Sequence, residues 1–281
     1  MAKIDKNQFT KDEWKKVRAL RQHKKANTKT QKSVVSSQIS PQESVTSDDK
    51  KYIVCLKHGD KYGAEYVNTL HSMVQRHCTH EFEFVCFTEN SKGINTNIRI
   101  EPLPELPVAG WWYKPMFFNP NLQLQGTILF FDLDVIIFRN IDYLFDYKPG
   151  TFCIIKDFNR SMRPDWSKFN SSVFRLTVGD QAHVYNDFLT NTNSHVRRFH
   201  GDQDWIYHTV RANYDYWPQE WIQSYKWEMR KRAKIVRDHK GNRNFEQPGQ
   251  PHILPQTSVA VFHGQPNPKD CIDPWCKEHW C

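Results

Sequence analysis

Residues 127–138 read TILFFDLDVIIF, and the interpretation of the rest of the chain depends on this stretch. Residues 128–131 form a continuous apolar run, which is typical of a strand covered on both faces. A second apolar run, residues 135–138, follows closely, so Asp132 and Asp134 interrupt what would otherwise be solid core. Two carboxylates in such a setting lose hydration and repel each other, and they therefore need a nearby cation.

The spacing of the two aspartates favours a shared metal ion. In an extended backbone, residues i and i+2 point to the same side, so both carboxylates can reach one ion while Leu133 faces the core. Hard oxygen ligands favour Mn²⁺ or Mg²⁺, which commonly also hold substrate phosphates. The alternative is that the aspartates end a strand in solvent and cap the next turn. The flanking apolar runs favour the metal, because carboxylates are seldom buried unless they are paired.

The composition predicts a soluble, cytoplasmic globular protein. The chain has 281 residues, of which 25% are charged and 14% aromatic, and it can bury a large core. No apolar stretch approaches the roughly 18 residues of a membrane span, and the N-terminus lacks the apolar core of a signal peptide. The net charge of +8 comes from residues 1–32, which hold eleven Lys or Arg against three Asp or Glu, because the remaining residues hold 28 of each sign.

Two regions are expected: a basic N-terminal arm, residues 1–50, and one folded domain, residues 51–281. A capping box opens a basic helix expected over residues 11–25. Residues 27–50 are rich in Ser, Thr, Gln and Lys, which is typical of a flexible linker. The arm is a candidate for weak contact with an anionic membrane or nucleic acid. The alternative is a solvated arm that docks weakly on its own domain.

The order of strands and helices after residue 50 predicts an α/β fold. Apolar patterns indicate a strand, a helix and two further strands over residues 52–56, 66–77, 82–87 and 98–100. Such spacing implies a parallel sheet with right-handed crossovers. The chain contains neither Gly-x-Gly-x-x-Gly nor Gly-Lys-Ser/Thr, which argues against dinucleotide oxidoreductases and P-loop NTPases.

Four further polar residues are candidates for a functional site. Lys114, the only cation of the aromatic segment 111–116, is either a fixed positive charge near the metal or a snorkelling surface lysine. Asp202 and Asp204 open an expected helix, as ligand-binding groups or as simple caps. His263 directly follows a short buried strand and precedes a glycine, a position that suits a ligand. The alternative is a hydrogen-bonded core histidine.

Two segments near the C-terminus have several interpretations. Residues 217–245 interleave aromatic and basic side chains, which suits nucleic acid and equally suits sugar faces and phosphates. Cys271, Cys276 and Cys281 lie near His279, but their five-residue separations do not match a Cys-x-x-Cys knuckle, which argues against a zinc site.

Four short motifs follow one another along residues 51–270: Phe130-Phe131-Asp132-Leu133-Asp134, Asn170-Ser171-Ser172-Val173-Phe174, Gly201-Asp202-Gln203-Asp204, and Phe262-His263-Gly264 followed by Lys269. Together they resemble the GT-A glycosyltransferases, and most of all the family 8 enzymes, which include glycogenin and the bacterial lipopolysaccharide galactosyl- and glucosyltransferases. The resemblance implies a Rossmann-like, mixed and mostly parallel sheet flanked by helices. It also implies metal-dependent transfer of a sugar from a nucleotide-sugar donor, UDP-linked, to a glycan, a lipopolysaccharide-type acceptor or another hydroxyl.

The resemblance implies roles for individual residues. The metal, Mn²⁺ or Mg²⁺, would be bound by Asp132, Asp134 and His263. Asp202 and Gln203 would touch the donor sugar near the reacting carbon. The donor would also be contacted by Lys114, Leu133, Asn170 and Lys269.

The sequence departs from the family pattern in two places. Ser172 replaces the usual glycine after Asn170-Ser171, which alters the expected sugar pocket. Prolines stand before Lys269 instead of after it, so Lys226 competes with Lys269 as the phosphate ligand. Retention or inversion at the anomeric carbon stays open.

Two other classes of function are alternatives. A metal-dependent nucleotidyltransferase also uses paired aspartates, and its second metal would require a third carboxylate, for which Asp142 and Asp146 are available. A catalytically silent nucleotide-sugar or nucleic-acid binder would use the basic arm, and its binding would be salt-sensitive. Neither class explains the Asp-Gln pair and the late histidine together.

Overall fold

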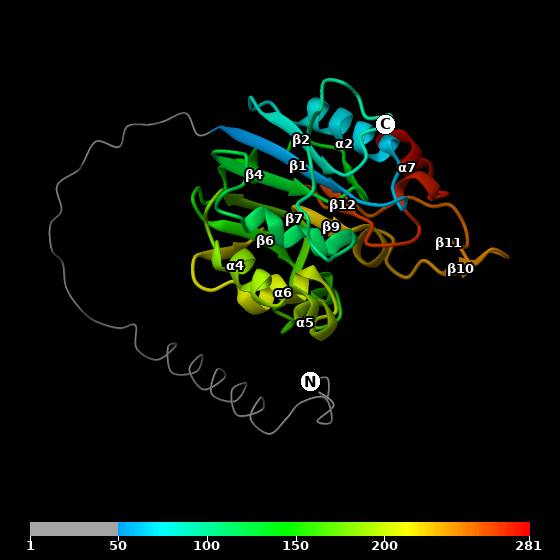
Figure 1. Cartoon of the computed structure of the whole chain (residues 1–281). Coiled ribbons are helices and arrows are strands. Elements are labelled where there is room, and N and C mark those ends of the chain that lie inside the picture. Colours follow the sequence, from blue (N-terminus) through cyan, green and yellow to red (C-terminus); the bar gives the residue numbers. More distant parts are fainter. Residues whose placement is uncertain (1–49) are drawn as a thin grey trace, which may run out of the picture. The chain divides into compact units, whose positions relative to one another are not determined.

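Seven strands form the central sheet in the order β3-β2-β1-β4-β7-β6-β8 in the computed structural model, which describes residues 50–281 (Figure 1). They are β1 Lys51–Lys57, β2 Glu83–Thr88, β3 Arg99–Glu101, β4 Thr127–Phe131, β6 Phe152–Lys156, β7 Phe169–Thr177 and β8 Tyr214–Tyr216. In this sheet β7 runs antiparallel to both of its neighbours, and the other pairs are parallel. The predicted mixed, mostly parallel α/β sheet is confirmed. The expected helix (residues 11–25) lies outside the described residues, as does the expected linker (residues 27–50) except for its last residue.

The first half of the domain follows the predicted strand-helix-strand order. Helix α2 (Ala64–His77) connects β1 to β2 and buries the expected apolar stripe, including Val67, Leu70 and Met73. Strand β1 lies between β2 and β4 and is covered on both faces, because Ile53 belongs to one core cluster and Val54 to the other. A strand covered in this way reads as a continuous apolar run in the sequence.

The stretch 127–138 is divided between two sheets, and this corrects the expectation of an extended backbone through the aspartates. Strand β4 ends at Phe131, the chain bends, and β5 (Val135–Ile137) pairs antiparallel with β12 (Val259–Val261). Strand β12 also pairs in parallel with β9 (Ile222–Ser224), which completes a three-stranded sheet, β5-β12-β9. Both apolar runs are buried as predicted, but Asp132 and Asp134 lie in the bend between two sheets.

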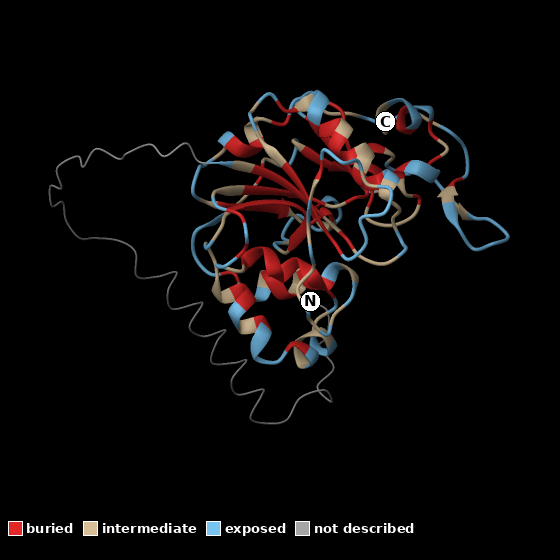
Figure 2. Cartoon of the chain, turned by 45° about the horizontal axis from the view of Figure 1, so that its top comes forward, coloured by how far each residue is buried: buried red, intermediate tan, exposed pale blue. Residues whose placement is uncertain are grey.

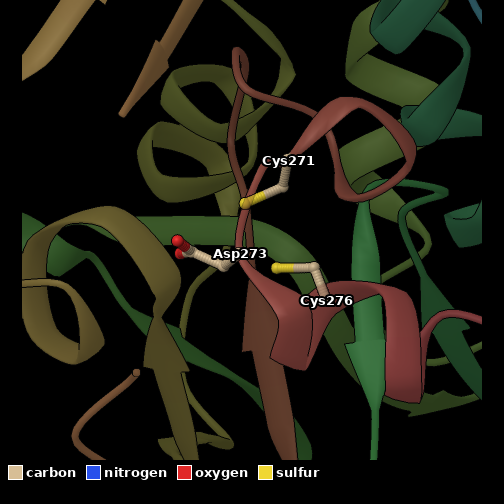
Figure 3. A group of neighbouring side chains, drawn as sticks. All are labelled: Cys271, Asp273 and Cys276. Atoms are coloured by element: carbon tan, nitrogen blue, oxygen red, sulfur yellow. The ribbon is translucent and has the colours of Figure 1, made fainter. Parts of the chain in front are cut away.

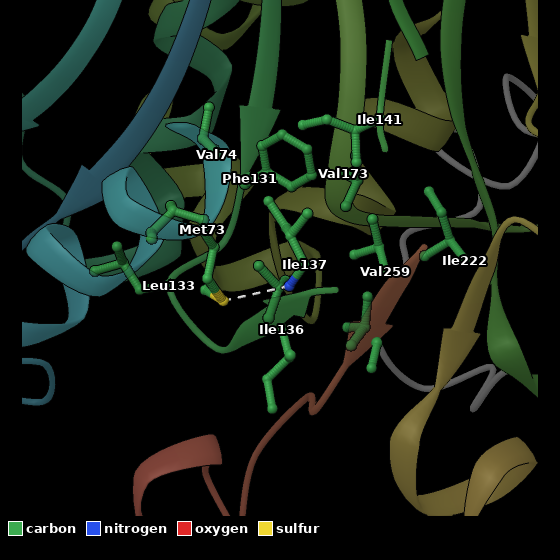
Figure 4. Close-up of a cluster of buried hydrophobic side chains, with 14 of the residues drawn as sticks. Met73, Val74, Phe131, Leu133, Ile136, Ile137, Ile141, Val173, Ile222 and Val259 are labelled. Carbon is green, nitrogen blue, oxygen red and sulfur yellow. Dashed lines mark hydrogen bonds between the residues drawn. The ribbon is translucent and has the colours of Figure 1, made fainter. Parts of the chain in front are cut away.

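The second sheet packs under α2. Figure 4 shows Met73 of α2 beside Ile136 and Ile137 of β5, with the backbone N–H of Ile137 3.4 Å from the Met73 sulfur. Ile222 of β9 and Val259 of β12 belong to the same core cluster. This packing fixes the exit of β12, where His263 stands, relative to the end of β4.

The opposite face of the central sheet is covered by a 3-10 helix, η2 (Gly110–Phe118), and by α4 (His183–Thr190) and α6 (Asp202–Thr209). Buried residues of these elements join the second core cluster with β4 and β7. Figure 2 shows the strands of the sheet as a continuous buried layer between exposed loops. Because η2 and α6 both contact the sheet, the segments that carry Lys114 and Asp202 are held against the end of β4.

The remaining helices and strands are short. The helices are α3 Tyr143–Asp146, α5 Thr192–Arg198 and α7 Pro274–His279, with short 3-10 turns η3 Phe158–Ser161 and η5 Pro268–Asp270. The aromatic and basic segment 217–245 forms β9, a π-helical turn η4 (Tyr225–Met229), and a hairpin of β10 (Ile235–Arg237) and β11 (Arg243–Phe245). In the described part of the chain, no helix is long and apolar enough to cross a membrane.

Candidate active site

A cleft of about 460 Å³ opens where β1, β4 and β12 end and where α6 begins. Eight of the ten predicted site residues line it, so segments far apart in sequence meet in one place: Lys114, Asp132, Leu133, Asp134, Asn170, Asp202, Gln203 and His263. The other two, Lys226 and Lys269, are not among its lining residues. Sites of this kind form at the carboxyl ends of strands in open α/β sheets.

Lys114 is buried at the centre of a charge network. Its ammonium lies 2.8 Å from an Asp132 carboxylate oxygen and 3.6 Å from Asp202 Oδ2, and it donates to the backbone and hydroxyl oxygens of Ser171 at 3.2 Å. Burial opposes the charge, but the two carboxylates outweigh it and raise the pKa of Lys114. The side chain is therefore a fixed cation inside the cleft and not a snorkelling surface lysine.

The inner cleft carries more negative than positive charge. Asp132, Asp134 and Asp202 lie around the buried ammonium of Lys114. With Lys61 and Asp204, the lining holds four carboxylates against two ammonium groups. Burial raises the pKa of Asp132 to about 6, against the opposing effect of Lys114, and repulsion from Asp134 adds to the rise. A third carboxylate thus does stand beside the pair, but it is Asp202 and not Asp142 or Asp146.

Asp134 is positioned from both sides. Its Oδ2 accepts hydrogen bonds from the Tyr62 hydroxyl at 3.0 Å and from the Gly264 backbone N–H at 3.3 Å. Its backbone oxygen accepts from the Phe262 N–H at 3.0 Å, which joins the bend after β4 to the end of β12. Burial and the nearby negative charge raise the pKa of Tyr62, so its hydroxyl keeps its proton and remains a donor.

His263 is held in an unusual backbone conformation. Its φ is +35°, a region that a non-glycine residue occupies at a cost of about 1–3 kcal/mol and that clusters at functional sites. The ring contacts those of Phe158 and Trp227, with centroids 5.5 and 4.6 Å away, and its Nε2 is 2.6 Å from Ser224 Oγ. Burial and the positive charge of Lys226 lower the pKa of His263 to about 4, so the imidazole is neutral at pH 7, as a metal ligand must be.

The residues at the start of α6 and in β7 are joined to this network. The Ser171 hydroxyl donates to Asp202 Oδ2 at 2.5 Å, and α6 has no side-chain cap, so Asp202 binds the neighbouring strand instead of capping its helix. Asn170, expected in a turn, lies inside β7, where its Oδ1 accepts from the Ser172 N–H at 3.1 Å. The pairing of β7 with β6 shifts register beside Asn170, and such a bulge re-aims side chains toward a site.

Three other charged residues singled out in the sequence form no hydrogen bond or ion pair with the network of Lys114, Asp132, Asp202 and Ser171. Lys226 donates to the backbone oxygens of His263 and Gln265 at 2.9 and 3.1 Å, and burial lowers its pKa to about 8. Lys269 pairs with Glu65 at 2.8 Å with half of its side chain exposed. Asp204, at the rim of the cleft, pairs with Lys168 at 2.8 Å.

The chemistry of the cleft fits a hard divalent cation, although the donor atoms of Asp132, Asp134 and His263 do not all lie within 4.8 Å of one another. The cleft offers two carboxylates and a neutral imidazole as ligands, and its lining holds more negative than positive side chains. Both features suit Mn²⁺ or Mg²⁺. Among the described residues, the group of three whose donor atoms all lie within 4.8 Å of one another is a different one, Cys271, Asp273 and Cys276.

Figure 3 shows the side chains of this cysteine cluster (Cys271, Asp273 and Cys276), and the contacts of Asp273 with other residues explain its position without a metal. Asp273 accepts hydrogen bonds from the Tyr225 hydroxyl at 2.7 Å and the Gly249 N–H at 2.9 Å, and it also pairs with Arg230. Its charge is therefore balanced by a guanidinium, which would repel a metal ion. Cys281 is exposed and does not belong to the cluster, so the zinc alternative built on the three cysteines and His279 gains no support.

Sequence reasoning misses several residues of the cleft. Tyr62, which holds Asp134, is separated from it in sequence and only the fold brings them together. Ser171 belongs to a predicted motif, but its bridging of Lys114 and Asp202 depends on the bulge in β7. The ring of Trp111 is half exposed, and only the fold shows that it lies at the rim of the cleft.

Comparison with solved structures agrees with this architecture. The galactosyltransferase LgtC, in complex with donor and acceptor sugar analogues, matches with a TM-score of 0.54 and 13% identity, over 81% of this chain and 93% of LgtC. The chain has the GT-A fold. A structure of an LgtC active-site mutant gives a TM-score of 0.55 at 12% identity, with the same coverage. The resemblance to family 8 is thereby confirmed at the level of the fold.

Other comparisons add less. The glycosyltransferase GlyE of Streptococcus pneumoniae TIGR4 matches with a TM-score of 0.47 and 12% identity, over 62% of this chain and 47% of GlyE. No family model matches the sequence, and no curated protein matches it.

Proposed function

We propose that the chain is a metal-dependent glycosyltransferase that moves a sugar from a nucleotide-sugar donor, UDP-linked, to a hydroxyl of a glycan. One observation carries the proposal: within a GT-A fold, the cleft at the strand ends gathers the paired aspartates, Lys114, the Asp-Gln pair and His263. A nucleotidyltransferase or a silent binder would have no need for this whole set.

The cation site would be formed by Asp132, Asp134 and His263. If the Nε2–H of His263 donates a hydrogen bond to Ser224 Oγ, the imidazole would offer its Nδ1 lone pair, since a hydrogen bond of this kind fixes the tautomer of a ligating histidine. The Tyr62 hydroxyl and the Gly264 N–H would keep Asp134 in place. A divalent cation bound there would supply Lewis-acid stabilisation of the diphosphate as it leaves.

The remaining groups have roles that follow from their charge and position. Lys114 would stabilise negative charge as it develops on the departing phosphate oxygen, since a buried ammonium held in place by its neighbours needs no reorganisation to do so. Asp202, fixed by Ser171, and Gln203 would orient the donor sugar against the incoming hydroxyl. Lys226 is the better candidate than Lys269 for a further phosphate contact, because its ammonium lies beside His263 whereas Lys269 is paired with Glu65.

The experiment is release of nucleotide from a panel of nucleotide sugars by the full chain with Mn²⁺, with EDTA as the control. We expect release from at least one donor, its loss in EDTA, and a fall of at least 100-fold in Asp134→Asn, which removes the charge but keeps the shape of the side chain. The variant should unfold at a temperature near that of the wild type. Release that persists unchanged in EDTA or in Asp134→Asn would overturn the assignment of the metal site.

A further inference from the structure

A second hollow of about 660 Å³ lies beside the candidate active site, between the end of η3, the π-helical turn η4 and strand β10. Three of its lining residues are large apolar side chains left open to solvent: Met162, Trp227 and Ile235, with exposed fractions of 67%, 39% and 39%. Exposed apolar side chains gathered in one hollow mark a binding surface more often than scattered ones do. An indole presents a flat face that suits the C–H face of a sugar ring and an N–H that suits its hydroxyls.

The charges of this hollow are mostly positive. Lys231 and Arg232 are exposed and, among the described residues, form no ion pair. Of the two acidic residues in the lining, Glu228 already pairs with Arg160 at 3.3 Å and accepts from the Ser224 N–H at 2.8 Å. The lining thus holds three cations (Lys226, Lys231 and Arg232) against two carboxylates, and both carboxylates, Glu228 and Glu220, interact with Arg160, so the hollow attracts an anion.

The wall between the hollow and the active-site cleft is thin. Trp227 lines the hollow, and its ring lies 4.6 Å from the ring of His263, which lines the cleft. Lys226 also lines the hollow and donates to the backbone oxygen of His263 at 2.9 Å. A molecule lying along Trp227 would therefore end next to the predicted metal site, where an accepting hydroxyl must be placed.

We propose that this hollow, with Trp227 as its apolar platform and Lys231 and Arg232 as its cations, binds the acceptor, and that the acceptor is a glycan carrying an acidic group. The inference rests on the proposed function and specifies its second substrate. Carboxylated and phosphorylated or sulfated sugars share the needed chemistry, and the test separates them.

The test is binding of the labelled full chain to a printed glycan panel with matched neutral, carboxylated, phosphorylated and sulfated members. We expect preferential binding of acidic members, and at least a tenfold loss of that binding in Lys231→Glu/Arg232→Glu. Lys92→Glu/Lys277→Glu is the matched control, because it makes the same change of charge at two exposed lysines that line neither cavity, and it should bind within twofold of the wild type.

Metal-dependent release of nucleotide without acceptor, measured on the same proteins, separates this inference from the proposed function. Lys231→Glu/Arg232→Glu should leave that release unchanged. The inference is overturned if the wild type binds neutral and acidic members equally or binds none. It is also overturned if the reversed charges make no difference, or if a single-stranded oligonucleotide binds tightly and displaces the glycans. Absence of nucleotide release with intact acidic-glycan binding would instead refute the proposed function.

Discussion

Replacing Lys114 by methionine should show how far the stability of the folded protein depends on one buried charge in the cleft. The residue is 4% exposed, and its ammonium holds Asp132 at 2.8 Å and Asp202 at 3.6 Å. Breaking a buried ion pair by removing one partner costs about 3–5 kcal/mol, because the other charge is left uncompensated. Asp132 is partly open to the cleft, so we expect the lower end, about 3 kcal/mol, for Lys114→Met.

The assay is urea denaturation followed by circular dichroism at pH 8 and pH 5. The deficit should be smaller at pH 5, because loss of the ammonium raises the already elevated pKa of Asp132 further and a bound proton then relieves the unbalanced charge. The control Lys168→Met removes an ion pair of the same 2.8 Å length with 40% of the lysine exposed, and it should cost at most about 1 kcal/mol. Equal effects of the two substitutions would refute the reasoning, as would a Lys114→Met deficit that grows on acidification.

Three further predictions concern stability. Asp142→Asn should cost about 1 kcal/mol of stability at pH 7. Burial raises the pKa of Asp142, but hydrogen bonds from Asn140 and Thr79 outweigh it and lower the pKa, so the difference from the wild type should shrink as the pH falls below the unfolded pKa of about 3.9. Thermal melts from pH 2 to 7 measure this difference, and a difference that stays constant would contradict the prediction. Ile136→Ala should cost about 3 kcal/mol in urea, because the side chain is fully buried beneath α2; a cost below about 1 kcal/mol would mean that the core relaxes around it. Arg230→Met should cost about 3 kcal/mol in urea by leaving Asp273 buried without a counter-charge. Added Zn²⁺ should not stabilise the wild type, in which Arg230 is present; a rise of its urea midpoint with Zn²⁺ would show that the cysteine cluster does bind a metal.

The features that depend on local pattern could be predicted from the sequence. Strand β1 and helix α2 are where their apolar periods place them, and the interruption of an apolar run by Asp132 and Asp134 is enough to locate the cleft. Buried carboxylates are informative in a sequence because they are costly unless they have a partner.

The features that the sequence could not predict depend on long-range packing. The two apolar runs of 127–138 look like one element, and only the antiparallel pairing of β5 with β12 shows that they belong to different sheets. Tyr62 reaches Asp134 because α2 packs over β5, a contact between segments 72 positions apart. Lys269 has the family spacing from His263, but spacing does not show that Glu65 binds its ammonium.

Calorimetric titration of UDP into the full chain, with Mn²⁺ or with EDTA, tests most directly that a cation held by the paired aspartates binds the diphosphate. We predict tight binding with Mn²⁺, at least tenfold weaker binding in EDTA, and in Asp134→Asn no difference between the two conditions. UDP that binds equally well without metal, or Asp134→Asn that retains the full effect of Mn²⁺, would contradict the account.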